Sequence, residues 1–273
     1  MTKDRGARGE GLGDTHPSRP LTDVERERYS RHLLLAGFDE AGQQRLRASR
    51  VLIVGLGGLG SPVAMYLAAS GVGELWLADF DAVDLSNLQR QLLHTTSRVG
   101  ATKVDSATEA LHALNPEVAL VPVKGALNSA RLGDLASRVD LVCDCSDNFA
   151  TRDAVNVACV AAGIPLVSGA AIRTEGQIAC FSGRAGEPCY RCLYPDLGEG
   201  AETCAREGVL APLVGIIGSM QATEAVKILA GLGEPLFGRL LLLDALTMEW
   251  RSLRIPADSS CAVCGPSTAQ ALT

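Results

Sequence analysis

A glycine-rich turn between a predicted strand and a predicted helix constrains the fold of this chain more than any other feature. Four β-favouring apolar residues, Val51 to Val54, lead directly into a G-x-G-x-x-G pattern, and an Ala/Leu-rich run from Pro62 to Ser70 predicts the helix. The start of such a helix offers unpaired N–H groups to a phosphate, so the unit is typical of nucleotide-binding proteins. The alternative is a glycine turn in a buried α/β unit that binds no ligand.

The predicted nucleotide-binding loop contains the glycines Gly55, Gly57, Gly58 and Gly60. We expect Gly55 to allow the tight turn, Gly57 to let a phosphate approach the backbone, and Gly60 to let the helix pack closely on the strand. The pattern by itself does not distinguish a nicotinamide cofactor from ATP.

The composition indicates a globular protein and excludes several kinds of partner. The chain has 273 residues, enough for one large domain or two small ones. Because 47% of the residues are hydrophobic but only 4% are aromatic, we expect an aliphatic core. Its net charge of −6 gives no basic excess, so we expect no nucleic-acid binding. We recognise neither a signal peptide nor an apolar run of membrane-spanning length, which predicts a cytoplasmic protein without membrane contact.

The N-terminal region is predicted to be a tail followed by a short basic helix. Residues 1–20 have almost no apolar content and are predicted to be disordered. Asp23 is expected to cap a helix from Val24 to Arg31, on which Arg28 and Arg31 share a face. The two arginines form a solvated basic face, or one of them contacts a phosphate. In the second case the phosphate could be held by a partner subunit.

Candidate nucleotide ligands follow the glycine loop. Asp79 ends the second predicted strand, where an acidic residue holds the hydroxyls of a ribose and repels a 2′-phosphate, so NAD and ATP remain possible. A polar segment then supplies Ser86, Asn87 and Arg90, and Lys103 follows shortly after. A helical turn would present Asn87 and Arg90 to one ligand. As a set these donors favour a triphosphate over a hydride-transfer site.

A third strand predicts a metal-binding carboxylate. The apolar run that begins at Leu141 ends in Ser-Asp-Asn, and ligands of open α/β sheets bind at the carboxyl ends of strands. Asp147 is therefore expected to hold Mg²⁺ against phosphates. Asn148 is expected to cap the next helix, near Thr151, and also belongs to the predicted nucleotide site. Cys143 and Cys145 are interpreted as packing residues.

The later segments predict the rest of the fold. Pro165–Ser168 reads as one more parallel strand, whereas 176–181, 238–244 and 248–255 read as strands without helices between them. A long apolar helix, 212–230, contains Gly215 and Gly218, which suit close packing. The predicted class is α/β, with a Rossmann-like, mostly parallel sheet, helices on both faces and an antiparallel extension.

Nine cysteines in a chain expected in the cytoplasm favour metal ligands, packing or catalytic thiols over disulfides. Cys189 and Cys192 form one Cys-x-x-Cys hook, and Cys261 and Cys264 form another, which together predict a closed, structural Zn²⁺ site with four sulfur ligands. Two redox dithiols are the alternative. Cys204 lies in a Gly/Glu-rich segment and is either a thiol nucleophile, activated by a neighbouring arginine, or a loop cysteine without an essential role.

Taken together, these residues resemble the MoeB/ThiF adenylyltransferases, relatives of the ubiquitin-activating enzymes. The matching motifs run in order over about residues 24 to 265 and comprise 28–31, 54–60, 79–81, 86–91, Lys103, 144–148 and both cysteine hooks. The resemblance implies a single adenylation domain over 21–273, with a nucleotide-binding half at about 50–150 and a carrier-binding and zinc half at about 165–265.

The resemblance also implies a reaction and roles for the matched residues. The chain would use ATP and Mg²⁺ to adenylate the C-terminal Gly-Gly carboxylate of a ubiquitin-like sulfur-carrier protein. Asp79 would hold the ribose, Asn87, Arg90 and Lys103 the phosphates, and Asp147 the Mg²⁺. Arg31 would reach the ATP of the other protomer in a homodimer.

Two branches of the family differ in their carrier. The segment 167–177 resembles the branch that acts on the MoaD-type carrier of molybdenum cofactor biosynthesis, whereas 250–253 resembles the branch that acts on the ThiS-type carrier of thiamine biosynthesis. We favour the molybdenum branch. An NAD-dependent oxidoreductase with a structural zinc is a more distant hypothesis, because it leaves Arg90, Lys103 and Asp147 without a role. A non-catalytic scaffold of the same fold is a third.

Overall fold

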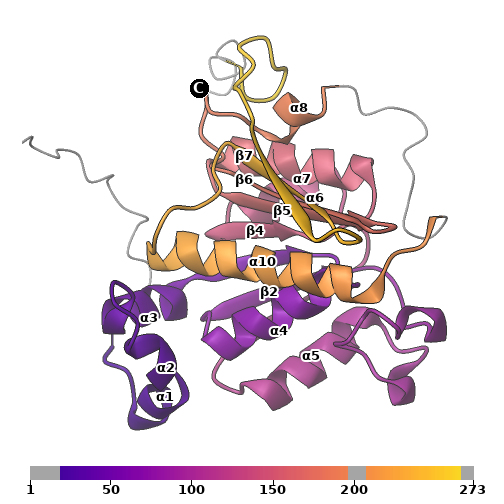
Figure 1. The fold of residues 1–273 in the computed structure, drawn as a ribbon. Coiled ribbons are helices and arrows are strands. Elements are labelled where there is room, and N and C mark those ends of the chain that lie inside the picture. The colour runs from indigo at the N-terminus through magenta and orange to yellow at the C-terminus, as the bar shows by residue number, and fades with distance from the viewer. Residues whose placement is uncertain (1–18, 196–206, 266–273) are drawn as a thin grey trace, which may run out of the picture.

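The computed structural model describes residues 19–195 and 207–265, so Cys204 and residues 1–18 of the predicted tail lie outside the described residues. The strands of this part form one eight-stranded sheet in the order β3-β2-β1-β4-β5-β6-β7-β8 (Figure 1). Their bounds are β1 Arg50–Val54, β2 Glu74–Asp79, β3 Ala119–Lys124, β4 Leu141–Asp144, β5 Leu166–Ile172, β6 Glu175–Phe181, β7 Arg239–Asp244 and β8 Glu249–Arg254.

The sheet changes from parallel to antiparallel at β5. The first five strands in the sheet order pair in parallel, and β6, β7 and β8 continue it as antiparallel hairpins. This confirms the predicted Rossmann-like sheet and its extension. Val51 to Val54 and the whole of β4 are buried, as expected for strands covered on both faces, whereas all six residues of the edge strand β8 are exposed.

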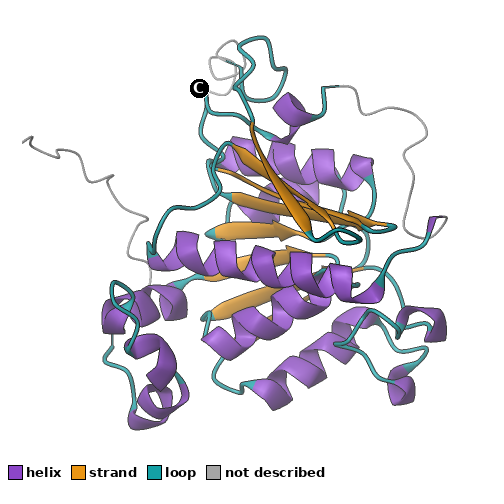
Figure 2. Cartoon of the chain, in the orientation of Figure 1, coloured by secondary structure: helices purple, strands orange, loops and turns teal. Residues whose placement is uncertain are grey.

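Helices cover both faces of the sheet (Figure 2). One face carries α3, α4, α5 and α10, with an aliphatic core beneath them, and the other carries α6, α7 and α8. The helix bounds are α1 Asp23–Arg28, α2 Ser30–Leu33, α3 Asp39–Ala48, α4 Gly60–Ser70, α5 Lys103–Leu114, α6 Ser129–Ala136, α7 Phe149–Ala162, α8 Tyr190–Leu193 and α10 Ala211–Ala230. The described 3₁₀ helices are η1 Leu85–Asn87 and η2 Thr96–Arg98.

The predicted helix from Val24 to Arg31 is wrong in two respects. Its N-cap is Thr22, whose side chain accepts a hydrogen bond from the backbone N–H of Glu25, and the helix breaks at Tyr29. The Tyr29 side chain turns inward, where its hydroxyl accepts a hydrogen bond from Asn115 Nδ2 at 3.0 Å. Because of the break, α1 and α2 are separate helices, so the regular three-residue spacing that predicted a common basic face does not apply.

The long helix α10 corrects the statement that no apolar run reaches membrane-spanning length. It has 20 residues, and an 18-residue stretch of it has a mean hydropathy of 1.3, so by length and composition it could cross a membrane. Half of its residues are buried within the protein, and it packs against α4, β5 and β6. We therefore interpret α10 as a core helix. Cys143 and Cys145 are buried in the sheet, as predicted for packing residues.

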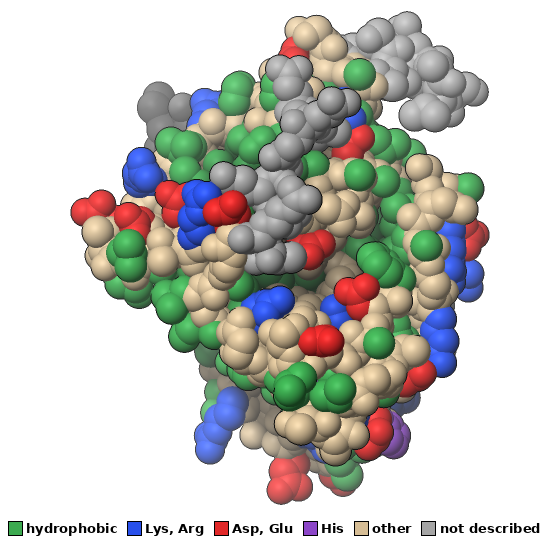
Figure 3. Space-filling view, turned by 90° about the vertical axis from the view of Figure 1, so that its right-hand side faces the viewer, with side chains coloured by type: hydrophobic (Ala, Val, Ile, Leu, Met, Phe, Trp, Pro, Cys, Tyr) green, Lys and Arg blue, Asp and Glu red, His purple; other side chains and the backbone are tan. Residues whose placement is uncertain are grey.

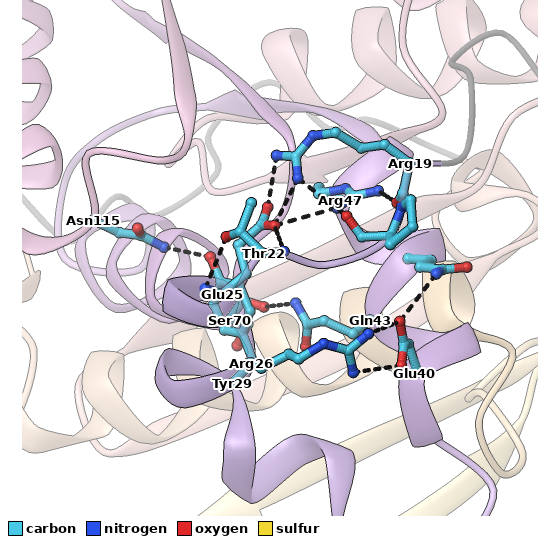
Figure 4. A network of polar contacts seen from close by, with 12 residues as sticks. Arg19, Thr22, Glu25, Arg26, Tyr29, Glu40, Gln43, Arg47, Ser70 and Asn115 are labelled. Carbon is cyan, nitrogen blue, oxygen red and sulfur yellow. Dashed lines mark hydrogen bonds and ion pairs between the residues drawn. The ribbon is translucent and has the colours of Figure 1, made fainter.

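A buried carboxylate attaches α1 to the body of the protein (Figure 4). Glu25 is 2% exposed, yet it forms a two-bond ion pair with Arg19 at 2.8 and 2.9 Å and lies 3.4 Å from Arg47. Its carboxylate also accepts the backbone N–H of Thr22 at 2.7 Å. Burial alone would raise the pKa of Glu25, but the hydrogen bonds from Arg19 and Thr22 outweigh it and lower the pKa to about 2.

We predict that Glu25→Gln lowers the free energy of unfolding by about 1–3 kcal/mol, because Arg19 and Arg47 lose a buried, charged hydrogen-bond acceptor. The folded-state pKa of Glu25 lies below the ordinary value, so its contribution is complete above about pH 4.5 and declines as the pH falls toward about 2. Urea unfolding of both proteins at several pH values measures this, and the difference should narrow within that window. Glu40→Gln, at the exposed pair with Arg26, is the control and should change the stability by less than about 1 kcal/mol. A difference that stays constant down to pH 2 would contradict the assignment.

Candidate functional site

A cleft of about 730 Å³ lies at the carboxyl ends of the parallel strands. Figure 3 looks onto this side of the molecule, where basic and acidic side chains surround a hollow. The glycine loop after β1, the end of β2 and the loop after β4 all contribute to the lining. These segments are brought together because parallel strands end at the same edge of a sheet, as the sequence predicted.

The glycine loop folds as a tight turn from β1 into α4. Gly55 has φ +93°, and a Cβ atom there would lie 2.8 Å from the carbonyl oxygen of Cys145. A Cβ atom at Gly60 would lie only 1.9 Å from the carbonyl oxygen of Gly55, so α4 packs directly on the turn. Gly55, Gly57 and Gly58 line the cleft, whereas Gly60 lies behind them, where it serves the packing.

Asp79 ends β2 and lines the cleft, as predicted. Its two carboxylate oxygens accept the backbone N–H groups of Leu56 at 2.7 Å and Asp81 at 2.9 Å. These bonds fix the carboxylate between the glycine loop and the segment after β2. A carboxylate oxygen accepts more than one hydrogen bond, so this arrangement leaves capacity for the hydroxyls of a ribose.

Of the predicted phosphate ligands, Arg90 and Lys103 line the cleft, whereas Ser86 and Asn87 do not. Arg90 donates to the backbone oxygen of Ser86 at 3.2 Å, which attaches it to the short η1 segment. The two hydrogen bonds from Ser86 lower the pKa of Asp84, which closes this turn. The predicted helical turn is thus a 3₁₀ turn, held by its own side chains.

Lys103 begins α5 and is 5% exposed. Its ammonium group lies 2.8 Å from the carboxylate of Asp81, which the sequence analysis did not assign to the site. Asp81 lines the cleft and is half exposed. Its signals in the sequence were its place two residues after Asp79, on the same side of an extended segment, and its membership of the motif 79–81.

The loop after β4 places Asp147 and Asn148 in the lining. Asn148 is the N-cap of α7 and accepts the backbone N–H of Thr151 at 2.9 Å, which confirms its predicted capping role. Asp147 is exposed to solvent and therefore available to a ligand. Tyr190 also lines the cleft, and burial raises the pKa of its hydroxyl, which remains protonated at neutral pH.

Arg31 does not belong to the cleft of its own chain. It is an exposed residue of α2 and is absent from the lining. The neighbouring Arg28 donates to the backbone oxygen of Leu114 at 3.2 Å within the same chain. Both arginines are exposed, and Arg28 is the one that this bond attaches to its own chain.

The four cysteines of the two hooks form one cluster. Their sulfur atoms lie within 4.8 Å of one another, with Cys189 to Cys261 at 3.8 Å and Cys192 to Cys264 at 3.4 Å. Zinc–sulfur bonds of about 2.3 Å in a tetrahedron separate the sulfurs by about 3.8 Å, so the geometry fits one ion. Asn156 Nδ2 donates to the sulfur of Cys189 at 3.6 Å, as expected next to a metal-binding thiolate.

Comparison with known proteins agrees with the site. The profile of the ThiF family matches residues 29–263. The chain belongs to the ThiF family. It is 54% identical over 245 residues to the molybdopterin-synthase adenylyltransferase of Escherichia coli K12, which covers 90% of this chain and 98% of that protein. With the sulfur carrier protein ThiS adenylyltransferase of the same organism it is 45% identical over 249 residues, or 91% and 99% of the two chains.

Longer relatives and solved structures share the same fold. The chain is 47% identical over 267 residues to the adenylyltransferase and sulfurtransferase MOCS3 of Bos taurus, but this covers 97% of the chain and only 58% of that protein. A crystal structure of E. coli MccB with MccA-N7isoASN superposes with a TM-score of 0.78 at 25% identity, over 88% of this chain and 74% of that one. The ThiF-family chain is thus an adenylyltransferase, and the oxidoreductase hypothesis finds no support.

We predict that Gly60→Ala lowers both the stability and the affinity for ATP, because its Cβ atom would lie 1.9 Å from the carbonyl oxygen of Gly55. The backbone of the loop has to move, and we expect a loss of about 1–3 kcal/mol, as for overpacked cores. Gly133→Ala in α6 is the matched control, because nothing lies within 4 Å of its Cβ position. It should leave ATP binding unchanged and raise the stability by up to about 1 kcal/mol. Calorimetric ATP titration and thermal unfolding measure both, and equal behaviour of the two variants would contradict the packing argument.

Proposed function

We propose that this enzyme adenylates the C-terminal Gly-Gly carboxylate of a ubiquitin-like sulfur-carrier protein in molybdenum cofactor biosynthesis. The observation that carries the proposal is the cleft, where a phosphate-binding glycine loop, two cationic side chains and the exposed carboxylate of Asp147 meet. The identity of 54% with a molybdopterin-synthase adenylyltransferase supports the choice of carrier. We place the reaction in the cytoplasm.

The bound ATP would lie across the glycine loop. Gly57 and Gly58 line the cleft beside the proposed phosphates, and Asp79 is held where it can accept the hydroxyls of the ribose. Arg90 and Lys103 would bind the phosphate chain. Ser86 and Asn87 would position Arg90 through the short turn to which its side chain is hydrogen-bonded.

The reaction needs positioned positive charge more than a protein nucleophile. A carboxylate oxygen of the carrier attacks the α-phosphorus of ATP, the bond from this phosphorus to the bridging oxygen breaks, and pyrophosphate leaves with the bonding electrons. Both partners are negatively charged, so Lys103 and Arg90 lower the barrier by reducing repulsion and by stabilising the leaving group. Magnesium, when bound by Asp147, would neutralise phosphate charge and orient the chain of phosphates.

A second copy of the chain would complete the site. Arg31 is exposed and lies outside the cleft of its own protomer. In a homodimer it could bind the phosphates held by the other protomer, where a guanidinium group forms paired hydrogen bonds to phosphate oxygens. Cys204 has no part in this scheme, because adenylation itself requires no thiol.

We propose that the cysteine cluster holds one structural Zn²⁺. All four sulfur positions would be used, so no ligand position remains open for water or substrate. The two pairs lie 72 residues apart, and the ion would thus join the segment after β6 to the end of the described chain. Such a link restrains the unfolded chain and stabilises the carrier-facing half of the protein.

The ThiS-type carrier of thiamine biosynthesis is the second candidate. The 45% identity with a ThiS adenylyltransferase supports it, over nearly the full length of both chains. The reaction and the site residues are the same for the two carriers, so the choice depends on carrier contacts.

We predict carrier-dependent ATP–pyrophosphate exchange with a MoaD-type carrier. Asp147→Asn should reduce the exchange rate by at least about a hundredfold, since a carboxylate ligand of Mg²⁺ is lost. Asp134→Asn, at an exposed position of α6, is the control and should leave the rate unchanged. ATP–pyrophosphate exchange with only the ThiS-type carrier would instead assign the enzyme to thiamine biosynthesis. Carrier binding without any exchange would instead favour a non-catalytic scaffold.

We predict about one zinc ion per chain in protein purified without chelators, as expected of four thiolate ligands. Cys264→Ser should lose the zinc and unfold at a lower temperature. Cys159→Ala, at a buried cysteine in α7 outside the cluster, should retain the metal. Elemental analysis and thermal unfolding measure both effects. Protein without zinc and with free, stable thiols would rule out the structural site.

A further inference from the structure

A buried arginine beneath the cleft has no role in the adenylation scheme. Arg152 lies on α7, is 6% exposed and contributes to the lining next to Asp147. A buried guanidinium group keeps its charge and costs free energy to desolvate, so its neighbours should explain its presence.

Arg152 and Asp144 hold the two backbone groups of Ser146, a residue of the loop that carries Asp147. The Arg152 Nη2 atom donates to the backbone oxygen of Ser146, while its Nη1 atom lies 3.9 Å from the carboxylate of Asp144. Asp144 is fully buried and accepts the backbone N–H of Ser146 at 3.1 Å and its hydroxyl at 2.6 Å. A further bond from the Ser168 hydroxyl, at 2.9 Å, fixes the same carboxylate to β5. Asp147 directly follows Ser146, the residue that these bonds fix.

Tyr190 contacts the same guanidinium group. It lies within the first cysteine hook, at the start of α8, and its side chain interacts with that of Arg152. The tyrosine is itself well anchored, because its backbone N–H donates to Asn156 Oδ1 at 2.9 Å. Its ring also meets the edge of Phe181 at a centroid distance of 6.2 Å. A continuous chain of contacts therefore runs from the cysteine hook to the loop that carries Asp147.

We propose that Arg152 is a positioning residue, which Tyr190 orients and which in turn fixes the Ser146 peptide so that Asp147 faces the cleft. The proposal rests on the proposed function, in which Asp147 holds Mg²⁺. It adds that the affinity for the divalent cation depends on α8, a helix to which the proposed function assigns no nucleotide ligand. Residues that orient metal ligands in this way commonly change metal affinity by about 10–100-fold when they are altered.

Tyr190→Phe tests the proposal with little risk to folding, because it removes a single hydroxyl group. We expect the Mg²⁺ concentration for half-maximal ATP–pyrophosphate exchange to rise about tenfold, with the rate restored at saturating Mg²⁺ and the KM for the carrier unchanged. Hydrogen exchange at the backbone N–H of Ser146, which donates to Asp144, should accelerate in the same variant, because Arg152 then holds the carbonyl group of the same residue less firmly. Arg152→Lys keeps the charge but lacks the forked geometry, so it should show the same two changes.

Tyr194→Phe is the matched control. It removes a hydroxyl group adjacent to the same helix, but one that donates to Gln177 on β6 at 2.9 Å. Its Mg²⁺ requirement and the exchange of the Ser146 amide should equal those of the wild type.

Two results would overturn the proposal. The first is a wild-type Mg²⁺ requirement in both Tyr190→Phe and Arg152→Lys while the wild-type enzyme is active. The second is a higher KM for the carrier alone in Arg152→Lys, which would make Arg152 a direct substrate contact. If the wild type itself catalyses no exchange, the proposed function fails, and the amide exchange of Ser146 then decides whether Tyr190 and Arg152 fix the loop.

Discussion

The close approach of α4 to the glycine turn is the contact on which the rest of the site depends. With no Cβ atom at Gly60, the helix lies against the carbonyl oxygen of Gly55, and its first turn then points at the cleft. The long helix α10 also packs closely on this loop, because a Cβ atom at Gly218 would lie 2.5 Å from the backbone oxygen of Leu59. Gly215, predicted to serve the same purpose, has nothing within 4 Å of its Cβ position. Of these two glycines in α10, only Gly218 therefore allows the close packing of this helix on the glycine loop.

The change of strand direction at β5 gives the cleft two kinds of wall. The parallel half ends in loops whose N–H groups and carboxylates suit a nucleotide. The antiparallel half instead contributes side chains from strand faces, such as Gln177 on β6 and Arg251 on β8. A reaction that joins a nucleotide to a protein tail needs both, since one substrate requires a phosphate cradle and the other an open, extended surface.

Most of the fold could be predicted because its signals are local in sequence. The apolar runs of β1 and β4 and the glycine turn gave the correct strands, and the cysteine spacing gave the correct cluster. The break at Tyr29 could not be predicted, because it depends on Asn115, which is 86 positions away in the sequence. The side-chain amide of Asn115 donates a hydrogen bond to the buried Tyr29 hydroxyl. Lys103 was assigned from its charge, but its pairing with Asp81 arises only when α5 starts beside the end of β2. The role of Arg152 was equally hidden, since its partners belong to β4, the loop after β4 and α8.

The pairing of the buried cations explains how an acidic protein can hold a triphosphate. A buried cation without a partner costs free energy, because it leaves water without compensation. Asp81 gives Lys103 a counter-charge at 2.8 Å, and Asp144 gives one to Arg152 at 3.9 Å. The two pairs differ in access. Asp81 is half exposed, and a phosphate can share or replace it at the ammonium group, whereas Asp144 is fully buried and keeps its place. One cation is thus free to exchange partners during binding, and the other remains fixed and holds the shape of the loop.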